Sequence, residues 1–92
     1  MPWQVYVLRN EKGRRYVGST GRSAQQRLSE HNAGLNFWTR ANGPWRLVYF
    51  ESFETKQATL RRERYFKTGA GRRTLDVLVG RAGVDQGKAQ SG

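Results

Sequence analysis

The stretch from Arg15 to Gly34, RYVGSTGRSAQQRLSEHNAG, gathers three side chains that could act together on an anion. It holds a phenol, Tyr16, a guanidinium, Arg27, and an imidazole, His31, from the single histidine of the chain. Arg27 and His31 are four residues apart, so a helix would place them on neighbouring spots of one flank. We predict that these groups serve chemistry on an anion, above all a phosphate.

A second phenol, Tyr6, lies in the aromatic segment WQVYVL near the start of the chain. Tyrosines in strands are ordinarily packing residues whose hydroxyl stays wet, and this explanation is sufficient for Tyr6 or Tyr16 taken alone. A catalytic phenol needs a nearby cation that lowers its pKa toward the working pH. This basic chain could supply such a cation, so both interpretations stay open.

Arg27 and His31 also allow two interpretations. A positively charged histidine near the C-terminal end of a helix is stabilised by the helix dipole, and Arg27 could be an ordinary surface residue beside it. Alternatively, Arg27 holds a phosphate oxygen while His31 orients or transfers a proton. The residues alone favour neither interpretation.

Glu63 is the acidic residue whose setting best suits a metal ligand, because it lies in the basic run LRRERYFK. Mg²⁺ commonly binds through one or two carboxylates, with water and substrate phosphate completing its shell. The simpler alternative is a helical ion pair with Lys67, four residues on. The other six acids are dispersed, which does not fit a two-metal nuclease. One histidine and no cysteine exclude a zinc site of ordinary spacing.

Aromatic residues gather between residues 35 and 45. Trp38 and Arg40 could contact nucleic acid, the indole by stacking on bases and the guanidinium by following the backbone. Phe37 could stack in the same way or simply pack, as could Trp38. We expect Trp45 to begin a strand and to be buried.

The composition indicates one small domain with a polyanionic partner. The chain has 92 residues, of which 17 are Lys or Arg and 7 are Asp or Glu, giving a net charge of +10. Thirteen of the 17 are arginines, whose planar fork suits phosphate. A merely solvated basic surface is the weaker alternative. The absence of cysteine fits a reducing cytoplasm. No apolar run is long enough to span a membrane, and MPWQVYVLRN lacks the layout of a secretory signal.

The patterning predicts an α+β fold, a three-stranded antiparallel sheet flanked by helices in the order β-β-α-β-α-α. Ser23 and Thr55 are suited to capping helices, and Gly34 to ending the first one. We expect residues 1–80 to form the domain and 81–92 a flexible C-terminal tail. The expected strands are 3–8, 15–19 and 45–53, the helices begin near 23, 56 and 71 and end near 34, 68 and 79, and 35–44 is a loop.

Taken in order, these residues resemble the GIY-YIG nuclease superfamily, in particular its small stand-alone bacterial members. The resemblance runs from about Trp3 to Leu78 and so covers nearly the whole domain. Its landmarks are Val5-Tyr6, then Tyr16-Val17-Gly18 ten residues on, Arg27-Leu28 with His31 and Gly34, the pattern PWRLVYFESFET, and Glu63 followed by Lys67.

The resemblance implies a DNA endonuclease that works with one Mg²⁺ or Mn²⁺ ion. Tyr6 and Tyr16 match the two motif tyrosines, one of which acts as general base on a water molecule or positions it. Arg27 matches the arginine that stabilises the phosphate, and His31 the active-site histidine of many members. Glu63 matches the single carboxylate that holds the metal.

The sequence also departs from the family pattern. Gln4-Val5-Tyr6 stands where the first motif has Gly-Ile-Tyr, so its glycine is absent. Ser19 follows the second motif where some members place a lysine, and Arg22 could compensate. Larger members carry separate DNA-binding domains. Here affinity would come from the chain's own basic surface, for which we select Arg22, Lys67, Trp38 and Arg40, or from a partner protein.

Three functions are therefore considered. The first is a metal-dependent endonuclease in DNA repair or recombination, in the cytoplasm at the nucleoid, acting on branched, nicked or single-stranded DNA and needing no membrane. The second is a nucleic-acid-binding module without turnover that uses the same basic pocket. The third is a small basic protein that binds structured RNA.

Overall fold

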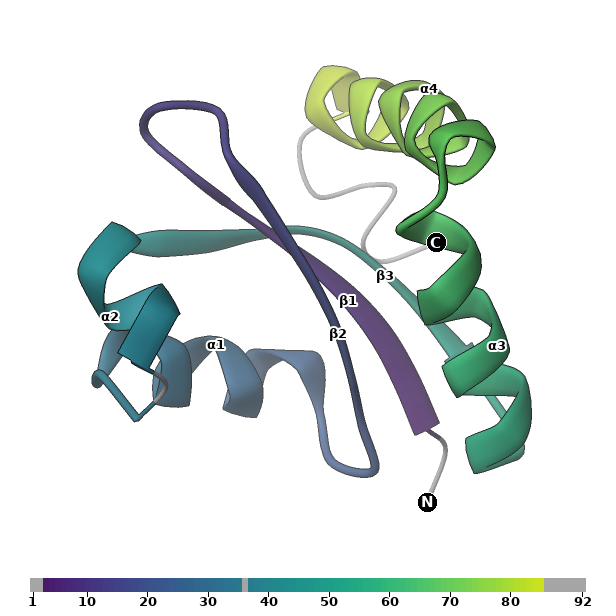
Figure 1. Ribbon diagram of the computed structural model, residues 1–92, viewed down its shortest axis with the longest axis horizontal. Coiled ribbons are helices and arrows are strands. Elements are labelled where there is room, and N and C mark those ends of the chain that lie inside the picture. The colour runs from purple at the N-terminus through teal and green to yellow at the C-terminus, as the bar shows by residue number, and fades with distance from the viewer. Residues whose placement is uncertain (1–2, 36, 86–92) are drawn as a thin grey trace.

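A three-stranded antiparallel sheet forms the centre of the computed structural model, which describes residues 3–35 and 37–85 (Figure 1). The strands lie in the order β2-β1-β3, so β1 is central and β2 is an edge strand. The elements along the chain are β1 (Trp3–Asn10), β2 (Arg15–Thr20), α1 (Ala24–Asn32), α2 (Phe37–Asn42), β3 (Trp45–Phe53), α3 (Lys56–Phe66) and α4 (Gly69–Asp85). This arrangement confirms the predicted α+β fold.

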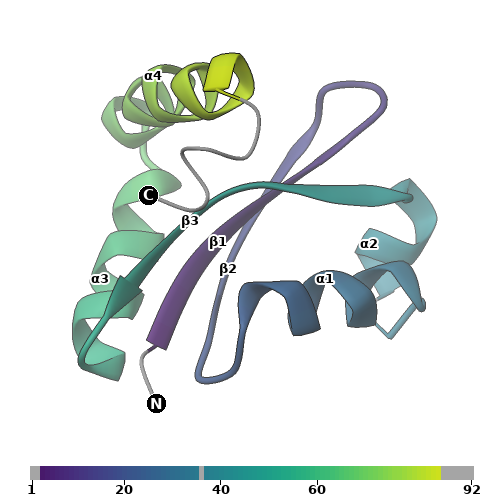
Figure 2. The same cartoon turned by 180° about the vertical axis from the view of Figure 1, so that it is seen from behind.

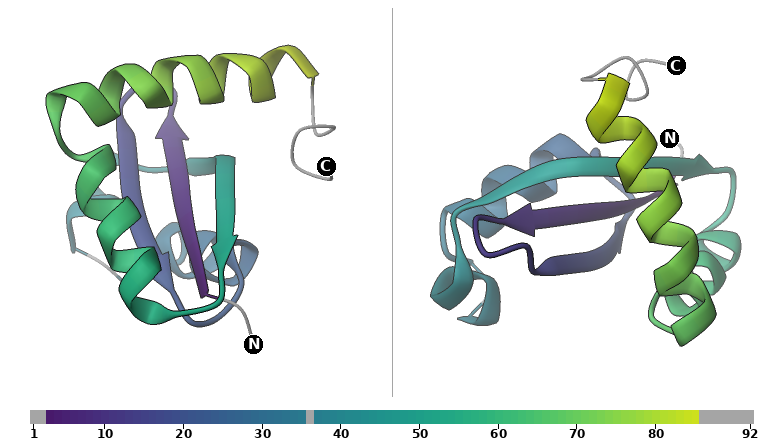
Figure 3. Two further views of the ribbon diagram at one scale, coloured as in Figure 1. Left: turned by 90° about the vertical axis from the view of Figure 1, so that its right-hand side faces the viewer. Right: turned by 90° about the horizontal axis from the view of Figure 1, so that it is seen from above.

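The helices cover the sheet from both sides, with α1 and α2 on one face and α3 and α4 on the other (Figure 3). Each face has its own buried cluster. The cluster between the sheet and α1 consists of Tyr6, Leu8, Ala24 and Trp45. The cluster between the sheet and the pair α3 and α4 consists of Val5, Val7, Phe66, Leu75 and Val79. Because β1 is buried on both faces, its alternating side chains contribute to both clusters.

The strand register places the two motif tyrosines on the same face of the sheet. Tyr6 pairs with Gly18 across β1 and β2, and Leu8 pairs with Tyr16. Directly opposite residues of an antiparallel pair share a face, and residues two apart along one strand do too. Tyr6 and Tyr16 therefore both point toward α1, a point that the sequence left open because it does not fix register.

An irregularity in the pairing of β1 with β3 changes which face the first half of β3 presents. Val7 pairs with Tyr49, but the next residue, Leu8, pairs with Leu47. Val48 is thus an extra residue on β3, a β-bulge that inverts the alternation beyond it. The inversion turns Trp45 and Leu47 toward α1.

Side chains cap the helices as the sequence predicted. The Ser23 hydroxyl accepts a hydrogen bond of 3.1 Å from the Gln26 amide at the start of α1. The Thr55 hydroxyl accepts one of 3.1 Å from the Ala58 amide at the start of α3. Gly34 follows α1 with a φ of 85°, the left-handed conformation that favours glycine after a helix.

The segment 35–44, predicted to be a loop, contains the short helix α2 between α1 and β3 (Figure 2). Its sequence FWTRAN has no helical period of apolar residues, so pattern reasoning misses it. Contacts with the rest of the fold hold it in place. The Trp45 indole donates a hydrogen bond of 2.7 Å to the Thr39 carbonyl, and the Asn10 side-chain amide donates one of 2.9 Å to the Asn42 carbonyl.

The ends of the other elements differ modestly from expectation. The first strand continues to Asn10, α3 ends at Phe66 rather than at residue 68, and α4 runs over 69–85 instead of 71–79. Residues 81–85, which we expected to begin the flexible tail, continue α4 instead, because the helix does not end at Gly80. Residues 86–92 of the expected tail lie outside the described residues, so that part of the tail stays a prediction. No helix within the described ranges combines the length and apolar character of a membrane span.

Candidate active site

Tyr6 extends from the central strand across β2 at Gly18. A Cβ atom built on Gly18 would lie 2.5 Å from the Tyr6 hydroxyl oxygen and 2.6 Å from its Cζ, closer than any side chain permits. The Tyr6 side chain is only 1% exposed, so it has no open space into which to retreat. The glycine of the YVG motif therefore allows the phenol to reach toward the outer edge of the sheet.

The Tyr6 hydroxyl belongs to a chain of hydrogen bonds that joins α1, α2 and the sheet. The hydroxyl lies 3.0 Å from His31 Nε2, and Arg27 Nε donates to it at 3.4 Å. His31 Nδ1 lies 2.9 Å from Thr39 Oγ1. Tyr6, His31 and Thr39 are all buried, so this chain is shielded from water. A stripe position on α1 that normally holds an apolar residue is thus filled by a fully bonded imidazole.

The hydrogen-bond donors in this chain define one self-consistent arrangement of protons. Because Arg27 donates to the Tyr6 oxygen, the Tyr6 proton is left to bond His31 Nε2. His31 Nδ1 then carries the imidazole proton and donates to Thr39. The opposite tautomer would leave the buried phenol proton without a partner.

The electrostatics of the site keep both groups neutral. Burial raises the pKa of Tyr6, although the Arg27 guanidinium offsets part of that effect. Burial and the positive charge of Arg27 lower the pKa of His31. At neutral pH the imidazole is therefore uncharged and able to accept a proton from the phenol.

Tyr16 is the more accessible of the two phenols. Its ring centroid lies 4.8 Å from that of His31 and 6.4 Å from that of Tyr6. Trp38, which is 41% exposed, stacks on it at 6.0 Å. Trp45 is buried beneath, as predicted, and packs on Trp38 at 5.6 Å. Tyr16, Trp38 and Trp45 therefore form an aromatic shelf that extends from the buried imidazole to solvent.

Glu30 is a residue of the site that sequence reasoning missed. It forms ion pairs with Arg27 and, at 2.7 Å, with Arg22. One carboxylate between two guanidinium groups leaves one positive charge and fixes the orientation of Arg27. The spacing of three residues between Arg27 and Glu30 on a predicted helix was the signal that could have identified this pair.

Glu63 approaches the edge strand from the opposite side of the sheet. Its Oε1 accepts a hydrogen bond of 2.7 Å from the Ser19 hydroxyl, and its Oε2 lies 2.7 Å from Lys67 Nζ. Ser19 pairs with Val5 and so faces α3, away from Tyr6 and Tyr16. The structure shows no hydrogen bond between Glu63 and those phenols. Its negative charge nevertheless contributes to raising the pKa of Tyr6, which places it within electrostatic range.

The five predicted catalytic residues therefore divide into four and one. Tyr6, Tyr16, Arg27 and His31 meet on the α1 face, and Glu63 reaches the same edge strand from the α3 face, at the residue after Gly18.

The donor set at Glu63 fits a magnesium site with a single carboxylate. The Glu63 side chain is 19% exposed, so it is not fully sealed from solvent. Lys67, which now bonds the second oxygen, is 55% exposed and able to turn away. Residues 3–35 and 37–85 contain no group of three or more metal-ligating side chains. A site with one protein ligand, completed by water and phosphate, is the kind that these residues permit.

The residues predicted to bind nucleic acid lie around this edge but do not form one cluster. Arg22 and Lys67 are exposed and paired with acids, Arg22 with Glu30 and Lys67 with Glu63. Trp38 lies on the aromatic shelf, and Arg40 is exposed on α2 beside Gly34. The side chain of residue 37 lies outside the part of the chain that the structure describes.

Comparison with known proteins decides the family. The model of the GIY-YIG catalytic domain matches residues 2–75, most of the chain. The chain belongs to the GIY-YIG family. This GIY-YIG domain contains the whole sheet, α1, α2, α3 and the first part of α4. The family is a nuclease superfamily whose members in general act on DNA with a divalent metal ion, and the resemblance predicted from the motifs is confirmed.

Relatives of similar size support the assignment to the small stand-alone GIY-YIG proteins. A UPF0213 protein of Clostridium perfringens is 36% identical over 75 residues, 80% of each chain. A UPF0213 protein of Streptococcus agalactiae is 40% identical over 68 residues, 73% of this chain and 76% of that one. The solution structure of a UPF0213 protein from Bacillus halodurans matches with a TM-score of 0.52 and 31% identity over 85% of both chains.

Proposed function

We propose that this chain is a divalent-metal-dependent endonuclease that hydrolyses DNA phosphodiester bonds with one metal ion. The observation that carries the proposal is the buried chain from Arg27 through Tyr6 and His31 to Thr39, with a solvent-accessible phenol, Tyr16, beside it. A purely structural role does not require a guanidinium, a phenol and a neutral imidazole to be bonded in sequence beneath an open aromatic shelf.

The two phenols have different parts in this proposal. Tyr16 is the phenol that water from solvent can reach, so it positions the attacking water. Tyr6 is buried and lies 3.0 Å from His31 Nε2, so it would pass its proton to the neutral imidazole as it takes up the proton that the attacking water gives up. Thr39 holds that imidazole in the tautomer that can accept the proton.

Positive charge offsets the negative charge that develops on the phosphate. Arg27 contributes a guanidinium whose orientation Glu30 fixes. Glu63 would hold the metal ion, which when bound adds further positive charge beside the phosphate oxygens. Ser19, bonded to Oε1 at 2.7 Å, keeps the carboxylate at the edge of β2.

The decisive experiment removes the carboxylate. We expect Glu63→Ala to abolish cleavage in Mg²⁺ or Mn²⁺ while DNA binding persists, because the remaining basic residues still attract the backbone. Cleavage should be screened on branched, flapped, nicked and single-stranded DNA, with EDTA as the blank. Glu54→Ala is the matched control, because Glu54 is exposed and makes no ion pair with a described residue. Equal cleavage by wild type and Glu63→Ala would overturn the one-metal assignment.

The assignment of the phenols has its own test. We expect Tyr16→Phe to lower the cleavage rate about 100-fold, within the range that acid–base and positioning groups contribute. Tyr65→Phe is the control, because its hydroxyl bonds Thr74 at 2.7 Å on the α3 face. Full activity in Tyr16→Phe would show that Tyr6 or another group, and not Tyr16, positions the water. Preferential cleavage of branched, flapped or nicked DNA in the same screen would support our proposal that the enzyme acts in DNA repair or recombination at the nucleoid.

One observation favours the alternative of a binding module without turnover. Both Glu63 oxygens already have protein partners, Ser19 and Lys67, so the carboxylate has no need of a metal to be satisfied. This alternative predicts DNA binding that weakens steeply with salt and no cleavage of any substrate in the screen. Competition between DNA and structured RNA would separate it from an RNA-binding protein.

A further inference from the structure

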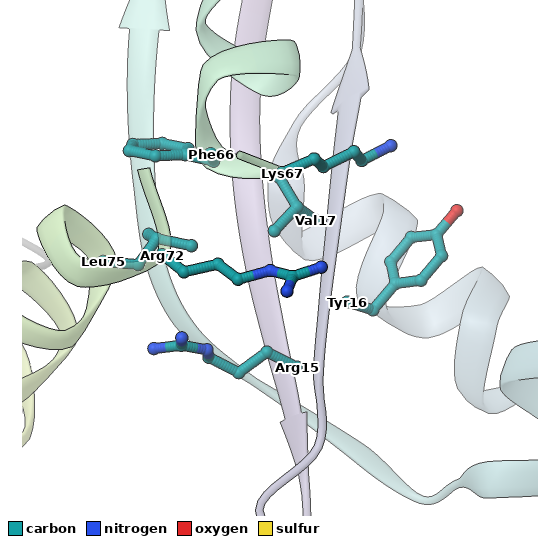
Figure 4. A pocket seen from close by; sticks show the side chains of 7 residues that line it. All are labelled: Arg15, Tyr16, Val17, Phe66, Lys67, Arg72 and Leu75. Carbon is teal, nitrogen blue, oxygen red and sulfur yellow. The ribbon is translucent and has the colours of Figure 1, made fainter. Parts of the chain in front are cut away.

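A pocket of about 380 Å³ lies beside the edge strand on the side of α3 and α4 (Figure 4). Its floor is apolar and its walls are basic. The floor is made by Val17, Phe66 and Leu75, and the walls by Arg15, Lys67 and Arg72. An apolar floor with a few directed polar groups is typical of a binding site and is not expected of a solvated basic surface.

The charges around this pocket are not balanced. Arg15 pairs with Asp76 at 2.8 Å, and Lys67 pairs with Glu63 at 2.7 Å. The Arg72 guanidinium makes no ion pair or hydrogen bond with any side chain that the structure describes, and it extends from α4 across the pocket toward β2. Three cations facing two carboxylates leave one positive charge, which a single phosphodiester would neutralise.

The pocket continues in both directions along the strand. Toward the site, it shares Tyr16 with the aromatic shelf and Lys67 with the Glu63 carboxylate. Toward the hairpin, Arg15 also lines a second pocket of about 400 Å³ that contains Arg9 and Asp76. The two pockets meet at Arg15, and together they make up what we call the groove, which begins beside the candidate metal carboxylate. A small anion would occupy a fraction of it, whereas a chain of phosphates would follow it.

We infer that this groove binds the phosphodiester backbone of the DNA strand next to the cleaved bond, with Arg72 as a phosphate ligand. The inference rests on the proposed function for the identity of the strand. Arg15 is a second phosphate ligand, which in this structure is paired with Asp76. Lys67 lies between the groove and the site, because it lines the pocket and pairs with Glu63.

The test compares two neighbouring arginines. Arg72 and Arg73 are both exposed on α4, but only Arg72 lines the pocket. Affinity is measured by fluorescence anisotropy in EDTA, on a labelled oligodeoxynucleotide in whichever form, single-stranded or nicked duplex, the wild type binds more tightly. We expect Arg72→Gln to weaken binding about tenfold, as the loss of a charged hydrogen bond does. It should also lower the salt slope by about one. Arg73→Gln should stay within about twofold of wild type.

A second variant tests the groove by a gain in DNA affinity, which misfolding would not produce. Asp76→Asn releases the Arg15 guanidinium from its ion pair and removes a negative charge from the wall. We expect tighter DNA binding, by about twofold to fivefold, because one more cation faces the backbone. Equal affinities of Arg72→Gln and Arg73→Gln would overturn the inference, and so would unchanged or weaker binding by Asp76→Asn.

The results also separate this inference from the proposed activity. If binding depends on Arg72 but no DNA substrate is cleaved in Mg²⁺ or Mn²⁺, the groove inference holds and the proposed nuclease activity is wrong. If the protein cleaves DNA but Arg72→Gln and Arg73→Gln bind it equally well, the nuclease activity holds and the groove inference is wrong.

Discussion

The two faces of the sheet differ in what they bury, although the same three strands form both. Under α3 and α4 an apolar cluster dominates, and the buried Thr59 of α3 bonds the carbonyl of Thr55 in the turn before it. Under α1 and α2 the buried residues include a histidine, a threonine and a phenol in one hydrogen-bonded chain. The first face gains free energy from apolar burial, whereas the second must satisfy every polar group that it buries.

This difference indicates how so small a domain can hold a candidate active site. A buried polar chain is costly when any partner is missing, so the fold needs stability from elsewhere. The α3 and α4 face supplies it, while β1 connects the two because its alternate residues belong to both. Variants of the apolar cluster under α4 and of the hydrogen-bonded chain under α1 should therefore separate stability from activity.

The largest effect expected is the loss of apolar burial on the α4 side. Leu75 is 1% exposed, and Leu75→Ala should lower the free energy of unfolding by about 2–5 kcal/mol. Leu75 lines the groove, so DNA binding should weaken. At saturating DNA, however, the folded molecules should cleave at the normal rate, because Tyr6, His31 and Thr39 lie on the other face. Urea denaturation and cleavage per folded molecule measure the two quantities. A cleavage rate that falls with the folded fraction held constant would contradict the division between faces.

Gly18→Ala should produce the opposite pattern. The new methyl group would overlap the Tyr6 hydroxyl, so the buried phenol must leave its bond with His31. We expect cleavage to fall about 100-fold, while overpacking lowers stability by about 1–3 kcal/mol. Gly69→Ala is the control, because its added Cβ would point into open space and would meet no other part of the fold within 4 Å. Wild-type activity in Gly18→Ala would show that Tyr6 need not cross β2.

Two buried threonines give a matched comparison of smaller size. Thr39 bonds His31 Nδ1 at 2.9 Å, whereas Thr59, on α3, bonds the Thr55 carbonyl at 2.8 Å. Replacing either with Val should lower stability by about 1–3 kcal/mol, because each loses a buried hydrogen bond. Only Thr39→Val should also slow cleavage, by about tenfold, and shift its pH profile, because the imidazole tautomer is no longer fixed. Equal kinetic effects of the two variants would contradict the positioning role of Thr39.

The smallest effect expected is a pH dependence of stability from the α1 face. The pKa of His31 is lowered in the folded chain, so the unfolded chain takes up a proton first as the pH falls below about 6.5. The free energy of unfolding should therefore fall between about pH 7 and 5, and His31→Gln should lose less over that interval. Urea titrations at several pH values measure this difference. Parallel pH profiles would show that burial of the neutral imidazole is not the cause.

Local features of the chain were predictable because they depend on local physics. Ser23 and Thr55 cap helices through their own hydroxyl groups, and the run 45–53 has the aromatic and β-branched composition typical of a strand. The spacing of Arg27 and His31 on one helix flank was equally readable, and the structure bonds or packs both beside Tyr6.

Long-range features were not readable from the sequence. Thr39 lies in a helix that tertiary contacts hold in place, so neither α2 nor its bond to His31 shows in the pattern FWTRAN. The need for Gly18 depends on the register that places Tyr6 opposite it. The approach of Glu63 from the far face depends on how α3 packs, which strand and helix periodicity do not specify.

The extra residue in β3 makes that strand tolerant of a shorter chain at the bulge. Deleting Val48 would leave Tyr49 opposite Val7 and Leu47 opposite Leu8 in a regular ladder. Trp45 would still face Tyr16 and the Thr39 carbonyl, because the residues on either side of the bulge keep their partners on β1. Loss of the codon for Val48 should therefore be tolerated, whereas a residue inserted between Trp45 and Leu47 would turn Trp45 to the other face.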